Sequence, residues 1–335
     1  MAKDPTEDRS ASDSPTRGSA NAENEAARRG AVENEADAKS KVERKVKRKA
    51  KSSAKRKKQD RENDIDLHTL YEASVQNVDA DVDFIERIWR KKHEDRPHWL
   101  REDFCGSASL AAHFVTRHPD NRALGVDLDG ATLEWGRRHR VERLGDAASR
   151  ITLVERDVRH SAENDLEVVT AFNFSYWVFR TREELRAYFS SVHDSLRVGG
   201  LFFLDVFGGT AAMNTVEEET RHPRQEDPYG VRIPAFSYIW DQASFNPIDH
   251  EFVCHIHFEV GRGRRRKMLR RAFSYTWRLW TLPELRELLA EAGFSRSEVY
   301  VEGWDEEADE PDGIFRLKKR FDNEGSWIAY LVAAR

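Results

Sequence analysis

The stretch from Leu100 to Leu110 constrains the fold of this chain most strongly, because it predicts a strand, a tight turn and the start of a helix. The strand ends in two carboxylates, Glu102 and Asp103, and Gly106 lies in the turn of small residues that follows. Such a unit brings a ligand close to the backbone amides at a helix N-terminus. Carboxylates at its entrance repel a pyrophosphate, so the turn favours a cationic ligand.

Polar side chains also follow the next three strand-like runs. They are Asp127, Asp157 and the residues from Asn173 to Tyr176. Asp127 lies 24 residues after Asp103, close to the spacing of about 20 at which an acidic side chain binds ribose hydroxyls in nucleotide-binding βαβ units. Because open α/β sheets bind ligands at the carboxyl ends of their strands, these side chains are predicted to surround one site.

Residues 99–207 resemble the catalytic domain of class I S-adenosyl-L-methionine (SAM)-dependent methyltransferases. The Glu-Asp-Phe-Cys-Gly turn at 102–106 is similar to that of a bacterial subgroup, although Phe104 and Ala108 stand where the usual turn has glycines. The resemblance implies SAM as the cofactor, with its methionine portion beside the turn, its ribose on the acid after the second strand and its adenine at the third strand. The residues assigned to the cofactor are Asp103, Cys105, Gly106, Asp127, Leu128, Asp157, Val158 and Asn173.

The remaining sequence agrees with this α/β fold. Capping-box patterns at 181–184 and 281–284 predict two helix starts, and the apolar run 201–207 predicts a strand buried on both faces. Two further strands are predicted at 294–301 and 327–333. The resemblance implies a seven-stranded Rossmann-like sheet with helices on both faces, in which the last two strands form a hairpin.

Three parts of the chain are distinguished by composition. Residues 1–62 are predicted to be a disordered charged tail, because they contain few apolar side chains. Residues 63–98 are predicted to be a helical segment that precedes the methyltransferase domain at 99–335. Within that domain, 208–280 is predicted to be a β-rich insertion, with strand-like runs at 235–242, 252–259 and 269–279, that acts as a lid or as a dimer interface.

Charge bears on the partners. Residues 41–60 hold 11 Lys/Arg and 2 Asp/Glu, net +9, whereas residues 61–335 hold 38 and 49, net −11. The acidic body is not expected to bind nucleic acid, so such a partner could bind only through the basic segment 41–60. The alternatives for this segment are that it is solvated or that it contacts its own domain. The chain has two cysteines, no apolar run of membrane-spanning length and no signal peptide, so a cytoplasmic protein without membrane insertion is expected. The sequence leaves the oligomeric state open.

The methyl acceptor is predicted to be a small molecule, either an amine or a carboxylate-bearing compound. Asn173 and Tyr176 are the candidate catalytic residues, as an orienting group and a proton shuttle. Tyr71 either covers the ligand or only packs, and Arg278 with Trp280 is suited to a compact anionic or planar group. No metal is predicted: His255 and His257 share a strand face, but no third ligand is evident.

Three alternatives remain open from the sequence. The first is a methyltransferase that acts on RNA or protein through the basic tail. The second is a non-catalytic SAM-binding scaffold. The third is an NAD-dependent oxidoreductase, whose pyrophosphate turn requires Gly-x-Gly-x-x-Gly where this chain has Cys-Gly-Ser-Ala-Ser-Leu at 105–110.

Overall fold

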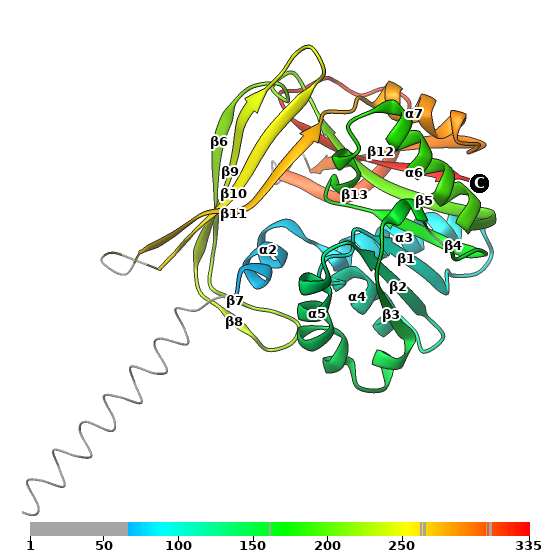
Figure 1. The fold of residues 1–335 in the computed structure, drawn as a ribbon, viewed down its shortest axis with the longest axis horizontal. Coiled ribbons are helices and arrows are strands. Elements are labelled where there is room, and N and C mark those ends of the chain that lie inside the picture. Colours follow the sequence, from blue (N-terminus) through cyan, green and yellow to red (C-terminus); the bar gives the residue numbers. More distant parts are fainter. Residues whose placement is uncertain (1–65, 161, 262, 264–265, 306, 308–309) are drawn as a thin grey trace, which may run out of the picture. The chain divides into compact units, whose positions relative to one another are not determined.

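The computed structural model describes residues 66–335, apart from 161, 262, 264–265, 306 and 308–309 (Figure 1). The predicted tail at 1–62 lies outside the described residues. Among the described helices, none is both long and apolar enough to cross a membrane. Both cysteines are buried and unpaired.

A mixed sheet of eight strands forms the centre of the fold, in the order β13-β12-β14-β5-β4-β1-β2-β3 (Figure 1). The five strands from β5 to β3 are parallel, and their carboxyl ends meet at one edge of the sheet. The parallel strands are β1 (Trp99–Asp103), β2 (Arg122–Asp127), β3 (Ile151–Glu155), β4 (Leu166–Ala171) and β5 (Leu196–Gly208). The antiparallel strands are β12 (Arg296–Asp305), β13 (Glu310–Lys318) and β14 (Trp327–Ala334).

The expected count of seven strands is wrong by one. The predicted strands 294–301 and 327–333 correspond to β12 and β14, which pair antiparallel, but they do not form a hairpin with each other. The chain between them forms β13, which pairs with the other side of β12. Its sequence contains Pro311 and Gly313, which weaken a strand prediction but are tolerated at a sheet edge.

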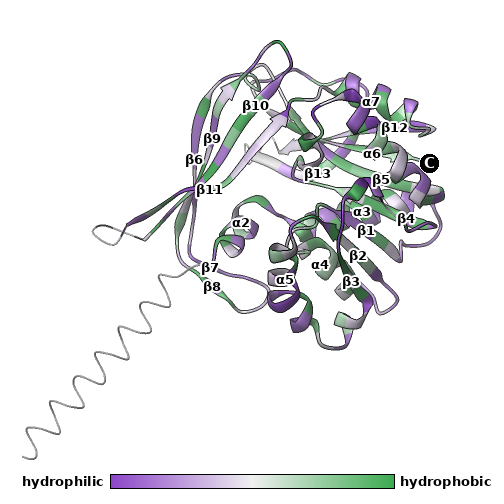
Figure 2. Ribbon diagram, viewed as in Figure 1, coloured by the Kyte–Doolittle hydropathy of each residue, from purple (hydrophilic) through white to green (hydrophobic). Residues whose placement is uncertain are grey.

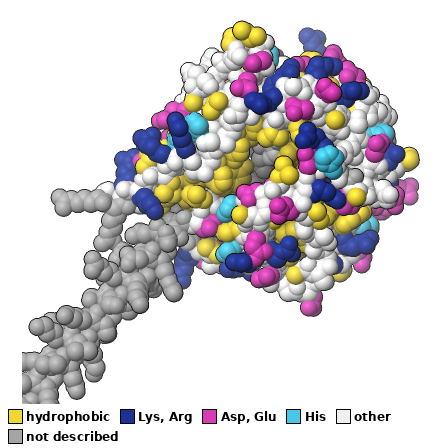
Figure 3. Space-filling model, in the orientation of Figure 1, with side chains coloured by type: hydrophobic (Ala, Val, Ile, Leu, Met, Phe, Trp, Pro, Cys, Tyr) yellow, Lys and Arg dark blue, Asp and Glu magenta, His cyan; other side chains and the backbone are white. Residues whose placement is uncertain are grey.

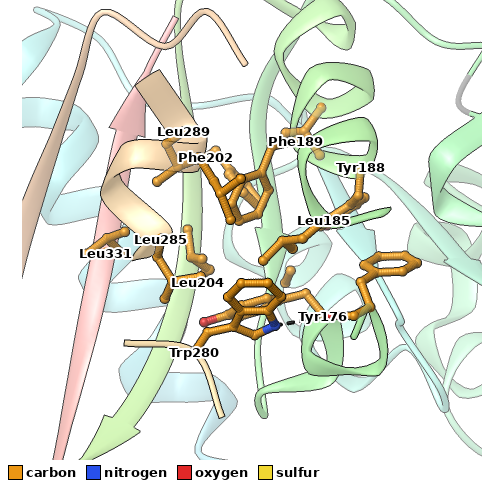
Figure 4. Packing of buried hydrophobic residues seen from close by; sticks show 14 of the residues in the cluster. Tyr176, Leu185, Tyr188, Phe189, Phe202, Leu204, Trp280, Leu285, Leu289 and Leu331 are labelled. Atoms are coloured by element: carbon orange, nitrogen blue, oxygen red, sulfur yellow. Dashed lines mark hydrogen bonds between the residues drawn. The ribbon is translucent and has the colours of Figure 1, made fainter. Parts of the chain in front are cut away.

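Helices cover both faces of the large sheet, as predicted. Phe202 and Leu204 of β5 belong to one buried cluster, whereas Leu201 and Phe203 belong to another, because successive side chains of a strand point to opposite faces. The first cluster includes helices α6 (Arg182–Ser195) and α7 (Leu282–Glu291), and Figure 4 shows their leucines and aromatic rings packed over β5. The second includes α3 (Val78–Lys92) and α4 (Ser109–Arg117). Figure 2 shows the hydrophobic colour concentrated in these central strands.

Local sequence signals explain several helix starts. Thr181 and Thr281 each form a complete capping box, with Glu184 and Glu284 respectively, as predicted. Asp129 caps α5 (Gly130–His139) by accepting hydrogen bonds from two backbone amides. The remaining described helical segments are α2 (Leu67–Val75) and the 3-10 turns η1 (Val141–Arg150), η2 (Val158–His160) and η3 (Ser175–Val178).

The insertion after β5 forms a second, antiparallel sheet in the order β11-β10-β9-β6. Three of its strands lie where the sequence predicts them, but the first, Glu-rich strand was not predicted because it lacks apolar alternation. Helix α2 packs on this sheet, since Leu70 shares a buried cluster with Phe236, Ile256 and Phe258. The strands are β6 (Val216–His222), β9 (Phe236–Phe245), β10 (Glu251–Val260) and β11 (Lys267–Arg278), with a short ladder of β7 (Gln225–Glu226) and β8 (Arg232–Ile233).

Candidate functional site

The turn between β1 and α4 is held in an unusual backbone conformation. Phe104, Gly106 and Ala108 all have positive φ, at 56°, 51° and 58°. A Cβ added at Gly106 would meet only a methyl carbon of Thr132, at 3.8 Å, so space remains open above the turn. Two non-glycine residues in the left-handed region store strain, which is common at ligand sites.

The carboxylate of Asp127 connects this turn to the end of β2. One oxygen accepts a hydrogen bond from the backbone N–H of Gly106 at 2.7 Å, and the other accepts from that of Asp129 at 2.9 Å. A carboxylate has about four lone-pair sites, so two remain for hydroxyl donors. Asp127 is therefore fixed in position and still able to accept further hydrogen bonds.

A cavity of about 270 Å³, here called the turn pocket, opens beside this turn. Its floor comes from the strand ends of the large sheet, and α2 and β11 supply the opposite wall. The turn pocket is lined by His68, Tyr71, Gln76, Phe104, Cys105, Gly106, Ser107, Asp127, Asp129, Thr132, Asn173, Ser175, Val178, Phe273, Tyr275 and Trp277.

A second cavity of about 400 Å³, here called the aromatic pocket, adjoins the first. Figure 3 shows hydrophobic side chains around a hollow on this face of the molecule. The two pockets share four lining residues: Tyr71, Asn173, Tyr275 and Trp277. The other residues that line the aromatic pocket are Val75, Phe174, Phe207, Ala211, Ala212, Asn214, Thr215, Val216, Glu218, Tyr238, Trp240, Gln242, Ile256, Ser326 and Ile328.

The loop after β4 lies at the junction of the two pockets. Asn173 and Phe174 have φ of 58° and 56°, and the buried carboxylate of Asp205 accepts hydrogen bonds from both of their backbone N–H groups, at 2.8 and 2.9 Å. Burial raises the pKa of Asp205 to about 7. Asp205 thus holds a strained loop that presents the side chain of Asn173 to both pockets.

Two tyrosines form part of the shared wall. Tyr71 of α2 and Tyr275 of β11 both line the two pockets. Burial raises the pKa of both phenols, so they are neutral near pH 7 and act as hydrogen-bond donors rather than as bases. Tyr71 packs against the cluster that contains Leu70 and also lines both pockets, so its predicted role of covering the ligand stays a prediction.

The structure brings together five of the predicted site residues. Cys105, Gly106, Asp127, Asn173 and Tyr71 all line the turn pocket. The cofactor role of the first four and the ligand-covering role of Tyr71 stay predictions. Burial raises the pKa of the Cys105 thiol, which keeps it protonated and unreactive.

The predicted adenine site lies outside the residues that line the turn pocket. Leu128, at the end of β2, exposes 69% of its surface, and Val158 is buried. Both carboxylate oxygens of Asp157 bind the guanidinium of Arg159, whose hydrogen bonds lower the pKa of Asp157. Asp157 is therefore ionised and already partnered.

Asp103, which the sequence assigned to the cofactor, does not line the turn pocket; it lines a small separate cavity of about 20 Å³ with Phe104 and Asn173. Its carboxylate is fully buried, 2.8 Å from Nε of Arg101, and accepts a hydrogen bond from the hydroxyl of Tyr188 at 2.9 Å. Residues two apart on a strand share a face, so Asp103 and Arg101 both point toward α6. Glu102 points the other way and accepts a hydrogen bond from the N–H of Ala111 at the start of α4.

Three other predicted residues, Tyr176, Arg278 and Trp280, line neither the turn pocket nor the aromatic pocket. Tyr176 is fully buried and donates a hydrogen bond to the backbone carbonyl of Asp205, and Trp280 donates one to the carbonyl of Phe179 (Figure 4). Arg278 is 3.1 Å from the carboxylate of Glu284 and lies over the Trp280 ring. Their polar groups thus contact the core and the start of α7.

Within the run at 275–280, the residues that line the pockets are not the ones that were predicted to bind the acceptor. Alternation along β11 places Phe273, Tyr275 and Trp277 on the face that lines the pockets. Arg278 and Trp280 follow at the end of the strand, where the chain leaves the sheet. His68 and Gln76 of α2 were missed because nothing local in the sequence shows what that helix covers.

The histidines of β10 have structural partners. His255 lies 2.8 Å from the hydroxyl of Ser274. Nδ1 of His257 accepts a hydrogen bond from the N–H of Arg271, which places the ring proton on Nε2, 3.2 Å from Asp241. Within the described part of the chain, this His257 belongs to the one candidate metal cluster, with Glu217 and Asp241, yet neither ring nitrogen has a free lone pair.

Comparison with known proteins identifies the fold. No family model matches the sequence, and no curated protein matches it. The structure is similar to a SAM-dependent methyltransferase from Clostridium acetobutylicum, at 16% identity and a TM-score of 0.57, over 80% of this chain and 97% of that one. It is equally similar to SAM-bound CalS10, an amino pentose methyltransferase from Micromonospora echinaspora, at 16% identity over 80% and 95% of the two chains and a TM-score of 0.57.

A third similar structure, DesVI of Streptomyces venezuelae, has 17% identity and a TM-score of 0.57, with coverage of 80% and 95%. The protein therefore has the fold of SAM-dependent methyltransferases, as the sequence predicted. Within that fold, the β-rich insertion and α2 supply the side of the pockets that faces the strand ends.

Proposed function

We propose that this protein is an enzyme that transfers a methyl group from SAM to a small molecule. The observation that carries the proposal is the pair of adjoining pockets with a common wall of Tyr71, Asn173, Tyr275 and Trp277. A transfer between two ligands requires their reacting atoms to meet in line, and two pockets that meet at one wall supply that alignment.

The turn pocket fits SAM by the chemistry of its lining. Open space above Gly106 admits a ligand close to the backbone, and Asp127 has acceptor sites left for ribose hydroxyls. Leu128, which follows β2 outside the lining of the turn pocket, exposes 69% of its surface and offers an apolar surface to an adenine ring. The ring faces of Phe104, Tyr275 and Trp277 attract a cation such as a sulfonium.

Bound SAM supplies a methyl group that is already activated by its sulfonium centre. The chain's residues consequently need only to orient and desolvate the reactants. Asn173, held by Asp205, offers an amide that orients an acceptor at the junction. The neutral hydroxyls of Tyr71 and Tyr275 donate hydrogen bonds there without removing a proton.

The acceptor is a small molecule because the aromatic pocket holds about 400 Å³, the size of a site for one compact ligand. CalS10, with the same fold, is described as a methyltransferase of an amino pentose, a ligand of this size class. The tail through which RNA or protein was considered as a substrate lies outside the described residues.

Calorimetry with SAM, S-adenosylhomocysteine (SAH) and NAD tests the cofactor assignment. SAM and SAH are expected to bind, and NAD is not. Asp127→Ala removes a charged acceptor from two hydroxyls and is expected to weaken SAH binding by about 1.5–3 kcal/mol. Asp120→Ala is the control, because the Asp120 side chain is 69% exposed and does not line either pocket. NAD binding more tightly than SAH would refute the proposal.

A further inference from the structure

The aromatic pocket has a distinctive charge pattern. Among its described lining residues, Glu218 is the one acidic side chain, and neither Lys nor Arg is present. The described part of the chain contains no ion pair to Glu218 within salt-bridge distance. Arg278, the cation that the sequence assigned to the acceptor, is bound to Glu284 away from the pocket. A carboxylate or phosphate ligand would therefore meet repulsion here without a balancing positive charge.

The register of the insertion sheet directs Glu218 to the pocket face. Glu218 of β6 is paired with Trp240 of β9, which in turn is paired with Ile256 of β10. Residues directly opposite each other on neighbouring strands share a face. Since Trp240 and Ile256 also line the aromatic pocket, the carboxylate of Glu218 lies on the same wall as they do.

Aromatic rings dominate that wall. Tyr275 and Trp277 are stacked with ring centroids 4.5 Å apart, and the ring of Trp240 lies 6.3 Å from that of Trp277. Tyr238 adds a further ring to the lining of the same pocket. Ring faces carry partial negative charge and attract cations, so the rings and the carboxylate favour the same sign of ligand charge.

We propose that the acceptor is a compact amine on an apolar or ring-shaped body, recognised by Glu218 and the aromatic wall. This inference rests on the proposed function and names the substrate class of the same site. The amine binds as its ammonium form, and the fraction that has lost a proton to water reacts. Its nitrogen lone pair forms the bond to the methyl carbon while the carbon–sulfur bond breaks, and the electron pair of that bond stays on sulfur. The methylated ammonium then releases a proton to water.

Matched sets of three compounds test the class. Cyclohexylmethylamine, cyclohexylmethanol and cyclohexanecarboxylate share one ring, as do benzylamine, benzyl alcohol and benzoate. Each compound is incubated with the full-length protein and SAM labelled in its methyl group, and products are separated by ion exchange. Label is expected in the amines only, with a rate that rises with pH toward the pKa of the amine.

The variant Glu218→Gln tests the recognition. It is expected to raise KM for the amine about fivefold, with kcat nearly unchanged, because an exposed carboxylate contributes up to about 1 kcal/mol to a cation. Glu217→Gln is the matched control. Glu217 is the neighbouring residue on β6, and its carboxylate lies with Asp241 and His257 rather than in the pocket. Trp240→Leu is expected to raise the same KM.

The outcomes separate the two proposals. Binding of SAH together with label in an alcohol or a carboxylate, or in none of the amines, overturns the amine assignment and leaves the cofactor assignment intact. Failure to bind SAH overturns both. An equal rise in KM for Glu217→Gln and Glu218→Gln shows that Glu218 has no specific role and also overturns the inference.

Discussion

Helix α2 is fastened to the rest of the domain by a buried ion pair, and breaking it is expected to open the turn pocket. Nε of Arg140 donates hydrogen bonds to the two carboxylate oxygens of Glu72 at 3.1 and 2.9 Å, and Nη2 also donates to this carboxylate. The guanidinium lies between the rings of Trp135 and Tyr229, 4.8 Å from each centroid. Ser107 of the turn donates a hydrogen bond to the same carboxylate.

The perturbation is Glu72→Gln. The side chains of Arg140 and Glu72 are 2% and 12% exposed, and removal of one partner from a buried pair costs about 3–5 kcal/mol. Asp227 remains 3.5 Å from the guanidinium and offsets part of this cost. We therefore expect the closed position of α2 to lose about 2–4 kcal/mol of free energy relative to the open one. The equilibrium between the two positions would shift toward the open one by at least about thirtyfold.

The consequence is read from ligand exchange. Because His68, Tyr71 and Gln76 of α2 line the turn pocket, release of this helix uncovers it. The dissociation rate of SAH, followed by stopped-flow displacement, is expected to rise by at least about tenfold. Amide hydrogen exchange is expected to accelerate in residues 67–75 before it does in the large sheet.

Two further variants control this experiment. Glu134→Gln breaks an exposed pair with Arg138 on α5, a contact worth about 1 kcal/mol or less, so it should change neither measurement. The double variant Glu72→Gln/Arg140→Met replaces the buried charge with an apolar side chain and should recover part of the loss. If folded Glu72→Gln keeps the wild-type SAH dissociation rate and the wild-type exchange of α2, the ion pair does not hold this helix closed.

Three other predictions concern groups outside the pockets. Burial raises the pKa of Glu102 from an ordinary value near 4.5 to about 8, so the folded state holds this proton more tightly than the unfolded chain does. The free energy of unfolding should therefore fall as pH rises between these two values. Glu102→Gln should remove this fall, which is measured by urea unfolding at pH 5 and 9. Arg278→Lys should lower the melting temperature without changing the KM of the acceptor, because Arg278 pairs with Glu284. A changed KM would indicate that Arg278 contacts the acceptor. Asp205→Asn keeps one acceptor oxygen for the two backbone amides, so it should destabilise the loop at Asn173 by about 1–3 kcal/mol. It should lower kcat more than it lowers SAH affinity. Stability and kcat equal to those of the wild type would contradict the positioning role of Asp205.

The parts of this protein that the sequence predicted depend on short-range signals. The turn at 102–106, the capping boxes at Thr181 and Thr281 and the acid of Asp127 after its strand were all recognisable. Each reflects a turn, a helix start or a strand end, whose physical cause lies within a few residues. From these the sheet and the methyltransferase fold could be inferred.

Tertiary structure decided which side chains meet at the site. Asp103 was itself assigned to the cofactor, and its side chain points into the core beneath α6. Trp277, the neighbour of the predicted residue Arg278, lines both pockets. A shift of one residue along a strand reverses the face, and the facing partner is set by packing between segments far apart in sequence. The position of α2 over the turn pocket depends on Arg140, 68 residues after Glu72. Such long-range contacts leave no local pattern, so only the folded chain shows which aromatic residues form the common wall.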